Sequence, residues 1–230
     1  MIRNYPAIRT LLRKKLTENI PFDQKMHWFH EKGVSIKVDD TDLYTLKKET
    51  DGHLSEISEI CERGLVYRGL NLLCFMGYNH KEVHFSEIQD LNHFTWDDKT
   101  IFMDDIDGRD IYMYHDPKIN DWLFSDNNKT FSSYKTLMLN NLYNVMNVDP
   151  AFTYHFKLVE RGNNSGIYLW TMYDTNRGIE MSYVYVDGHA IRLKVKHQNA
   201  YKFEGFEKLE ESDFPLIAID SYWRKIRITA

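Results

Sequence analysis

The stretch TIFMDDIDGRDIYMY, residues 100–114, decides how the rest of the chain is interpreted. Its two apolar halves predict two strands that flank the turn pair Asp107-Gly108. A strand, a short polar loop and a second strand are typical of an active-site loop. The acidic pair before Ile106 is unusual for such a loop.

Composition indicates one packed globular protein. The chain has 230 residues, of which 43% are hydrophobic and 14% aromatic, so a sizeable core is expected. The net charge of -5 argues against a protein that coats DNA generally. Two cysteines, Cys61 and Cys74, form neither a metal spacing nor a disulfide framework. With no signal peptide and no apolar run of about 20 residues, we expect a cytoplasmic location and no membrane contact.

Hydrophobic periodicity predicts an N-terminal helix followed mainly by strands. Residues 2–18 carry an apolar stripe at helical spacing and a basic face that we expect to be solvated. A second helix is predicted over 130–147. Strands are predicted at 33–38, 63–75, 100–105, 109–116, 122–125, 152–160, 166–174, 181–186 and 190–196, and an edge strand at 215–223.

This order of elements favours an α+β fold with antiparallel-rich sheets and flanking helices. With no repeat or linker in the sequence, we expect one domain over 1–230. It would comprise the helix at 2–18, a core at about 35–202 and a C-terminal extension at 203–230.

Five stretches together resemble one enzyme family. The sequence is similar, from about residue 35 to 202, to the adenylation domain of the phage-type ATP-dependent RNA ligases, within the covalent nucleotidyltransferases. The resemblance implies a nucleotidyltransferase (RNA/DNA ligase-like) fold. The five stretches are ERGLVYR (62–68), TIFMDDIDGRDIYMY (100–114), TYHFKLVE (153–160), YLWTMYDTNRGIEMS (168–182) and RLKVKHQNAY (192–201).

The family chemistry needs a lysine that this chain lacks. In the K-x-D-G motif of these ligases a lysine attacks the α-phosphate of ATP, and this chain has Asp105 in its place. The glutamate of the F-E-phi-V motif, where phi is apolar, is replaced by Lys157. A reciprocal exchange predicts that Asp105 and Lys157 lie within about 4 Å of each other or share one ligand.

The resemblance also implies a ligand-binding set. Lys194 and Lys196, two apart on a predicted strand, should point to one face and neutralise phosphate. Glu180 stands for the E-G motif glutamate, or nothing fills that role. We expect no metal site and name Lys157 as the substitute nucleophile. The predicted ligand-binding residues are Arg63, Asp105, Asp107, Gly108, Lys157, Glu180, Lys194 and Lys196.

The leading functional prediction is therefore a catalytically inactive RNA-ligase-like protein. It would bind ATP, AMP or another nucleotide, a nucleotide-derived signal, or an RNA 5′ or 3′ end. A phage counter-defence role, with a host defence protein as partner, follows by analogy. One alternative is an active ligase with a displaced nucleophile, which would need Mg²⁺. The other is a protein-interaction scaffold that binds no nucleotide.

Overall fold

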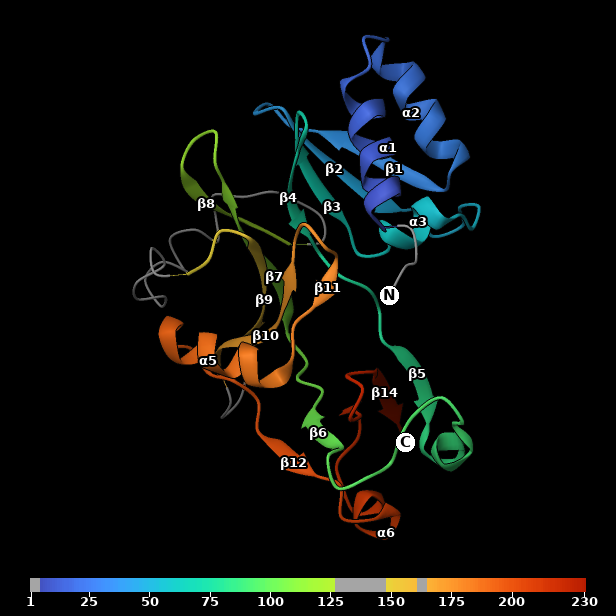
Figure 1. Cartoon of the computed structure of the whole chain (residues 1–230), viewed down its shortest axis with the longest axis vertical. Helices are drawn as coiled ribbons and strands as arrows, with labels where there is room; N and C mark the ends of the chain where they lie inside the picture. The colour runs from blue at the N-terminus through green and yellow to red at the C-terminus, as the bar shows by residue number, and fades with distance from the viewer. Residues whose placement is uncertain (1–4, 127–147, 161–164) are drawn as a thin grey trace.

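The computed structural model describes residues 5–126, 148–160 and 165–230 (Figure 1). Within them the chain forms three antiparallel-rich sheets with a few flanking helices, which confirms the predicted α+β class. The helix predicted at 130–147 lies outside the described residues. No helix in the described part of the chain is long and apolar enough to cross a membrane.

The first sheet lies beside the N-terminal helix, α1 (Tyr5–Thr17). The predicted stripe of α1 is buried at Tyr5, Ile8, Leu12 and Leu16 and packs in a core with residues of α2, α3 and this sheet. The sheet has the order β1 (Val34–Val38), β2 (Leu43–Lys48), β3 (Leu65–Arg68), β4 (Asn71–Phe75). The other two helices here are α2 (Phe22–Glu31) and α3 (Glu56–Ile60).

The second sheet packs on β4 of the first. The Phe75 amide donates a hydrogen bond to Thr153 Oγ1 at 3.1 Å, and Tyr112 and Tyr114 are buried against residues of β3 and β4. The order is β11 (Ile179–Glu180), β10 (Gly166–Asp174), β9 (Phe152–Val159), β7 (Arg109–Asp116), β8 (Asp121–Ser125). The predicted return of 122–125 onto β7 is confirmed.

The strands predicted at 181–186 and 190–196 are wrong, because most of this segment forms the helix α5 (Tyr183–Leu193). Val186, Ala190 and Leu193 recur at helical spacing and are buried in the core of the second sheet. Burial of this stripe outweighs the β propensity of the alternating tyrosines and valines.

The third sheet contains the predicted C-terminal strand, but not at its edge. β13 (Leu216–Ile219) lies between β6 and β14, and all four of its residues are buried. A short run that is apolar at every position is typical of a central strand. The order is β12 (Ala200–Lys202), β6 (Ile101–Asp104), β13, β14 (Lys225–Thr229), β5 (Lys81–His84), with the 3-10 helix η1 (Phe85–Asp90) and α6 (Phe206–Glu210) alongside.

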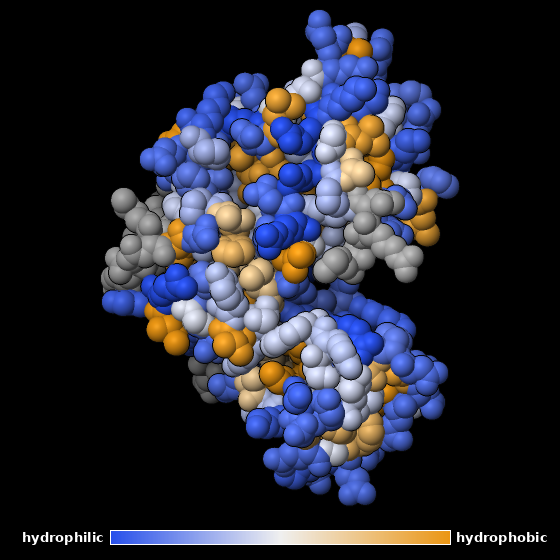
Figure 2. Space-filling model, viewed as in Figure 1, coloured by the Kyte–Doolittle hydropathy of each residue, from blue (hydrophilic) through white to orange (hydrophobic). Residues whose placement is uncertain are grey.

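The predicted strands on either side of Asp107-Gly108 are confirmed, but they belong to different sheets. The chain passes from the third sheet to the second at 105–108, so the third sheet and its helices form a lobe of their own (Figure 1). Figure 2 shows a notch in the surface between this lobe and the rest of the protein. Met103, Ile217 and Trp170 pack together where the two parts meet.

Candidate functional site

A cavity of about 490 Å³ lies between the second and third sheets, and we call it the cleft. Its volume is within the range of small-molecule sites, about 300–1,000 Å³. Side chains from both sheets, from the chain leading into β5 and from the turn before β3 line it. The lining residues are Arg63, Asn79, His80, Glu82, Asp105, Lys157, Trp170, Ile217 and Arg227.

Asp105 lines the cleft and is bound to an arginine of the third sheet. Arg227 Nε lies 2.5 Å from Asp105 Oδ2, and Arg227 Nη1 lies 2.6 Å from Glu82 Oε1. The Asp105 amide donates to the carbonyl of Pro215 at 3.1 Å, which fixes the end of β6. The position that the resemblance assigns to a nucleophilic lysine therefore holds a carboxylate in an ion pair.

Asp110, at the start of β7, is the centre of a second charged network. Its Oδ2 lies 2.9 Å from Arg63 Nη2, and its Oδ1 lies 2.7 Å from His155 Nε2 and 2.8 Å from Lys157 Nζ. Burial raises the pKa of the Asp110 carboxyl. The hydrogen bond from His155 and the charges of Arg63 and Lys157 outweigh that effect, so the pKa lies well below its usual range. Asp110 therefore stays ionised and holds two of the cations that line the cleft.

His155 is fully buried beneath this network and stacks on Tyr112, with ring centroids 4.5 Å apart. Burial lowers the pKa of His155 to about 4, although its hydrogen bond to Asp110 acts in the opposite direction. Because two cations already face Asp110, the imidazole is neutral near pH 7 and donates its Nε2 proton to the carboxylate.

Lys157 and Asp105 line the same cavity without forming an ion pair with each other. The Lys157 amine is bound to Asp110 and lies 5.5 Å from the ring centroid of Trp170. Asp105 is bound to Arg227 instead. The predicted direct contact is wrong, because each side chain is paired within its own part of the fold, Lys157 with Asp110 and Asp105 with Arg227. The other form of the prediction, in which both residues touch one ligand, stays a prediction.

The backbone conformation explains why a glycine follows Arg63. Gly64 has a φ of +140°, and a Cβ there would lie 2.7 Å from Met76 Sδ. Only glycine adopts this conformation at little cost. The turn leads directly into β3, and the Arg63 side chain before it reaches Asp110.

Glu180 lies on β11 and does not itself line the cleft. It accepts hydrogen bonds from Lys225 Nζ at 2.7 Å and Thr171 Oγ1 at 2.8 Å, and it lies 3.5 Å from His80 Nε2. Burial raises the pKa of this carboxyl. The neighbouring Lys225 and His80 outweigh that effect, so the pKa lies well below its usual range. Glu180 thus joins the second sheet to β14 and positions His80 at the cavity wall.

Besides Glu180, four predicted site residues lie outside the cleft. Asp107 is exposed, and Gly108 lies against β9, where an added Cβ would be 3.0 Å from the Leu158 carbonyl oxygen. Lys194 ends α5 with a φ of 51°, and the Lys196 amine donates to the Ser165 carbonyl at 2.9 Å. The prediction that both lysines leave one strand face is wrong, since this segment is a helix end.

Sequence reasoning missed four residues of these networks. Lys225 and Arg227 sit two apart on β14, while Ile226 and Ile228 between and after them are buried. The alternation in KIRIT was therefore a usable signal for two cations on one face. No local sequence signal could have indicated Asp110 and His155, because their contact joins segments 45 residues apart. The residues missed are Asp110, His155, Lys225 and Arg227.

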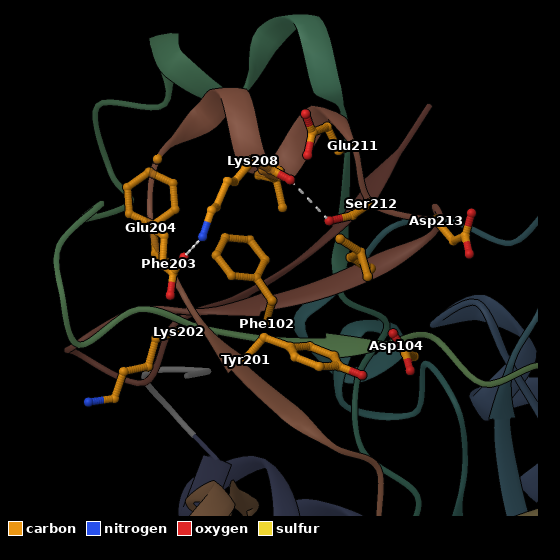
Figure 3. Close-up of a pocket in the computed structure, with 13 residues that line it drawn as sticks. Phe102, Asp104, Tyr201, Lys202, Phe203, Glu204, Lys208, Glu211, Ser212 and Asp213 are labelled. Carbon is orange, nitrogen blue, oxygen red and sulfur yellow. Dashed lines mark hydrogen bonds and ion pairs between the residues drawn. The ribbon is translucent and has the colours of Figure 1, made fainter.

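A larger cavity, of about 600 Å³, lies elsewhere in the third-sheet lobe, between β6, β12 and α6 (Figure 3). Phe102 stands at its centre, and the carboxylates of Asp104 and Asp213 lie together at one side. Burial raises the pKa of Asp104, and the Asp213 charge adds to this. No predicted site residue lines this cavity, so it is separate from the cleft.

The acidic side chains of the cleft do not form a metal site. Asp105 and Glu82 are both bound to Arg227. Throughout the described residues, no three His, Cys, Asp or Glu side chains come together as metal ligands would. The residues present therefore do not match a carboxylate-bound Mg²⁺.

Comparison with known proteins identifies the fold. No protein-family profile and no curated protein match the sequence. Two structures of an archaeal ATP-dependent RNA ligase are similar, with TM-scores of 0.63 and 0.66 and identities of 8% and 9% over 96% of this chain. A protein described as an ATP-dependent DNA ligase from Aquifex aeolicus matches 91% of it, with a TM-score of 0.64 and 10% identity. The chain spans 62–64% of these proteins' length. The fold is thus RNA/DNA-ligase-like, of the nucleotidyltransferase type.

Proposed function

We propose that this protein is a catalytically inactive member of the ligase-like fold whose cleft binds the phosphate of a nucleotide or of an RNA end. The observation that carries the proposal is the ion pair between Asp105 and Arg227. By the sequence resemblance, Asp105 stands where a ligase would need an amine, and it lines a cavity together with Arg63, Lys157 and Arg227.

The cleft cations retain donors for a phosphate. Arg63 uses Nη2 for Asp110, and Arg227 uses Nε and Nη1 for its two acidic partners. A guanidinium has five N–H donors, so each arginine can bind an anion and keep its ion pair. The Lys157 amine is held against the buried Trp170 indole at the cavity wall.

The test of inactivity is incubation with labelled ATP and Mg²⁺ or Mn²⁺. We expect no acid-stable protein–AMP adduct, because no amine occupies the Asp105 position. Detection of an adduct would refute the proposal. An adduct mapped to Lys157 would favour the alternative of a displaced nucleophile, which its amine at the cavity wall supports.

The test of binding is calorimetry with AMP, cyclic nucleotides and a 5′-phosphorylated oligoribonucleotide. Arg227→Gln should weaken binding about tenfold or more, since a charge-assisted hydrogen bond contributes roughly 1.5–3 kcal/mol. Lys81→Gln is the matched control, because Lys81 is exposed on the neighbouring strand β5 and does not line the cleft. No binding to any ligand of the panel would favour the scaffold alternative.

The finer predictions rest on this one. A phage protein could use such a cleft to sequester a host nucleotide signal, or its surface to occupy a host defence protein, both in the cytoplasm. These roles come from analogy with the resemblance. Co-purification of a nucleotide with the native protein, read by mass spectrometry, would test the first of them.

A further inference from the structure

The helix α1 is fixed to the turn that follows β10. The Tyr5 hydroxyl donates to the Thr175 carbonyl at 3.0 Å, and Arg9 Nη1 donates to the carbonyl and the side-chain oxygen of Asn176 at 2.5 and 3.0 Å. These contacts hold α1 beside the start of β4. Arg13 lies one helical turn after Arg9, so both guanidinium groups share one face of the helix.

A pocket of about 430 Å³ lies under this face, and we call it the α1 pocket. Its polar lining comes from Arg9, Arg13, Asn71, His115, Thr175 and Asn176. Leucine and proline side chains supply the remaining wall. No Asp or Glu is among the described residues that line it, although the chain as a whole is acidic.

Arg13 is the unusual member of this pocket. Its Nε has no exposed surface and no hydrogen-bond partner among the described residues. A partly buried guanidinium with no carboxylate beside it is unfavourable unless an anion binds it and neutralises its charge.

The acids that neighbour the lining residues in sequence are bound elsewhere. Asp116 pairs with Arg68 at 2.7 Å, the Asp149 carboxylate accepts from the Ala151 amide, and the Asp174 carboxylate accepts from the Asn176 amide. Asp174 also lies 3.6 Å from Arg177 Nε. None of the three lines the α1 pocket, and none pairs with Arg13 among the described residues.

We infer that the α1 pocket is a second anion-binding site, which takes a phosphate ester through Arg13 and Arg9. Arginine forks bind phosphate in two-point geometry, and the side-chain amides of Asn71 and Asn176 can add neutral donors. The volume exceeds what an inorganic phosphate fills, and the apolar wall suits the organic part of an ester. The inference does not depend on the proposed function of the cleft, because the two cavities share no residue.

Calorimetric titration of the full chain with AMP tests this assignment. Arg13→Gln should weaken binding at this site at least tenfold, whereas Lys14→Gln should change it less than twofold. Lys14 is the next residue of the helix, is exposed and does not line the pocket. The melting temperature of ligand-free Arg13→Gln should not fall, because the buried Arg13 Nε has no hydrogen-bond partner to lose; a purely structural role would lower it.

The two sites are separated by repeating the titration in Arg227→Gln. Binding that persists in this variant and is lost on adding Arg13→Gln supports the α1 pocket. Binding that Arg227→Gln abolishes and Arg13→Gln leaves unchanged would overturn the inference while keeping the proposed cleft. Equal losses in Arg13→Gln and Lys14→Gln would also overturn it, since they would indicate only a diffuse charge effect.

The source of the phosphate is distinguished by a second panel. A tetraribonucleotide with a 5′-phosphate is compared with the same oligomer without it and with AMP. Tighter binding of the phosphorylated oligomer than of AMP indicates a nucleic-acid end, and equal binding indicates a small phosphate ester. Equal binding of the two oligomers would contradict recognition of a terminal phosphate.

Discussion

The cleft and the α1 pocket both present arginines, but they differ in what those arginines already hold. In the cleft, Arg63 and Lys157 are bound to Asp110, and Arg227 is bound to Asp105 and Glu82. In the α1 pocket, Arg13 Nε is buried without a hydrogen-bond partner among the described residues. Internal ion pairs fix the shape of the cleft and compete with an anionic ligand. An unpaired cation makes binding easier and leaves the empty protein less stable.

The largest expected effect comes from breaking the Asp110 network. Asp110→Ala leaves Arg63 and Lys157 without their shared carboxylate, and we expect the free energy of unfolding to fall by about 3–5 kcal/mol. Urea denaturation measures it. Glu82→Gln, which removes an exposed partner of Arg227, should cost at most about 1 kcal/mol. A loss below 1 kcal/mol for Asp110→Ala would show that the cleft pairs are no more coupled than surface pairs.

As the pH falls, protonation of His155 should be the first event in the cleft network that lowers the free energy of unfolding. Its pKa is about 4 in the folded protein and 6.5 when unperturbed, so the unfolded chain binds the proton more readily. Stability is complete above about pH 6.5 and is lost as the pH falls toward 4, by on the order of 3 kcal/mol. Denaturation curves from pH 7.5 to 4 measure the slope. His155→Gln should flatten it, and an unchanged slope would assign the loss to other groups.

Below about pH 4 the carboxylates should add to this loss. Asp110 and Glu180 both have pKa values well below their usual range. Stability from such groups is present above the unfolded pKa and falls as the solution becomes more acidic. The α1 pocket contains no carboxylate lining residue and should contribute nothing to this part of the curve.

Removing the carboxylate that pairs with Arg227 should make the cleft bind an anion more readily, as we expect of the α1 pocket. Asp105→Asn removes the carboxylate that competes with a phosphate, and we expect AMP to bind about tenfold more tightly, a gain of about 1.4 kcal/mol. Calorimetry measures the change. Asp107→Asn is the matched control, because Asp107 is exposed and outside the cavity. Weaker binding in Asp105→Asn would mean that Asp105 contacts the ligand itself.

The smallest effect is expected where the predicted strand proved to be a helix end. The double change Lys194→Ala and Lys196→Ala should alter stability by less than about 0.5 kcal/mol and AMP binding by less than twofold. Both lysines are exposed and neither lines the cleft or the α1 pocket. A large loss of binding would mean that the ligand extends beyond both cavities.

Period-two patterns in the sequence predicted most of the strands. They failed where an alternating pattern overlapped an apolar stripe at helical spacing. MSYVYV alternates like a strand, yet the burial of Val186, Ala190 and Leu193 made it part of a helix. The same alternation in KIRIT was not used, although it places Lys225 and Arg227 on one face. Local patterns therefore predicted most elements and singled out Asp105, which lines the cleft. They could not predict its partner, because Arg227 lies 122 positions away.

The order of strands in the third sheet also constrains how the protein is made. β5 and β6 come from residues 81–104, but their neighbours β13 and β14 come from 216–229. At roughly 5–20 residues per second, a ribosome needs on the order of 10 s between the two segments. During that time β5 and β6 have unpaired edges, which favour aggregation. The lobe that carries Arg227 therefore contains the last of the three sheets that the nascent chain can complete.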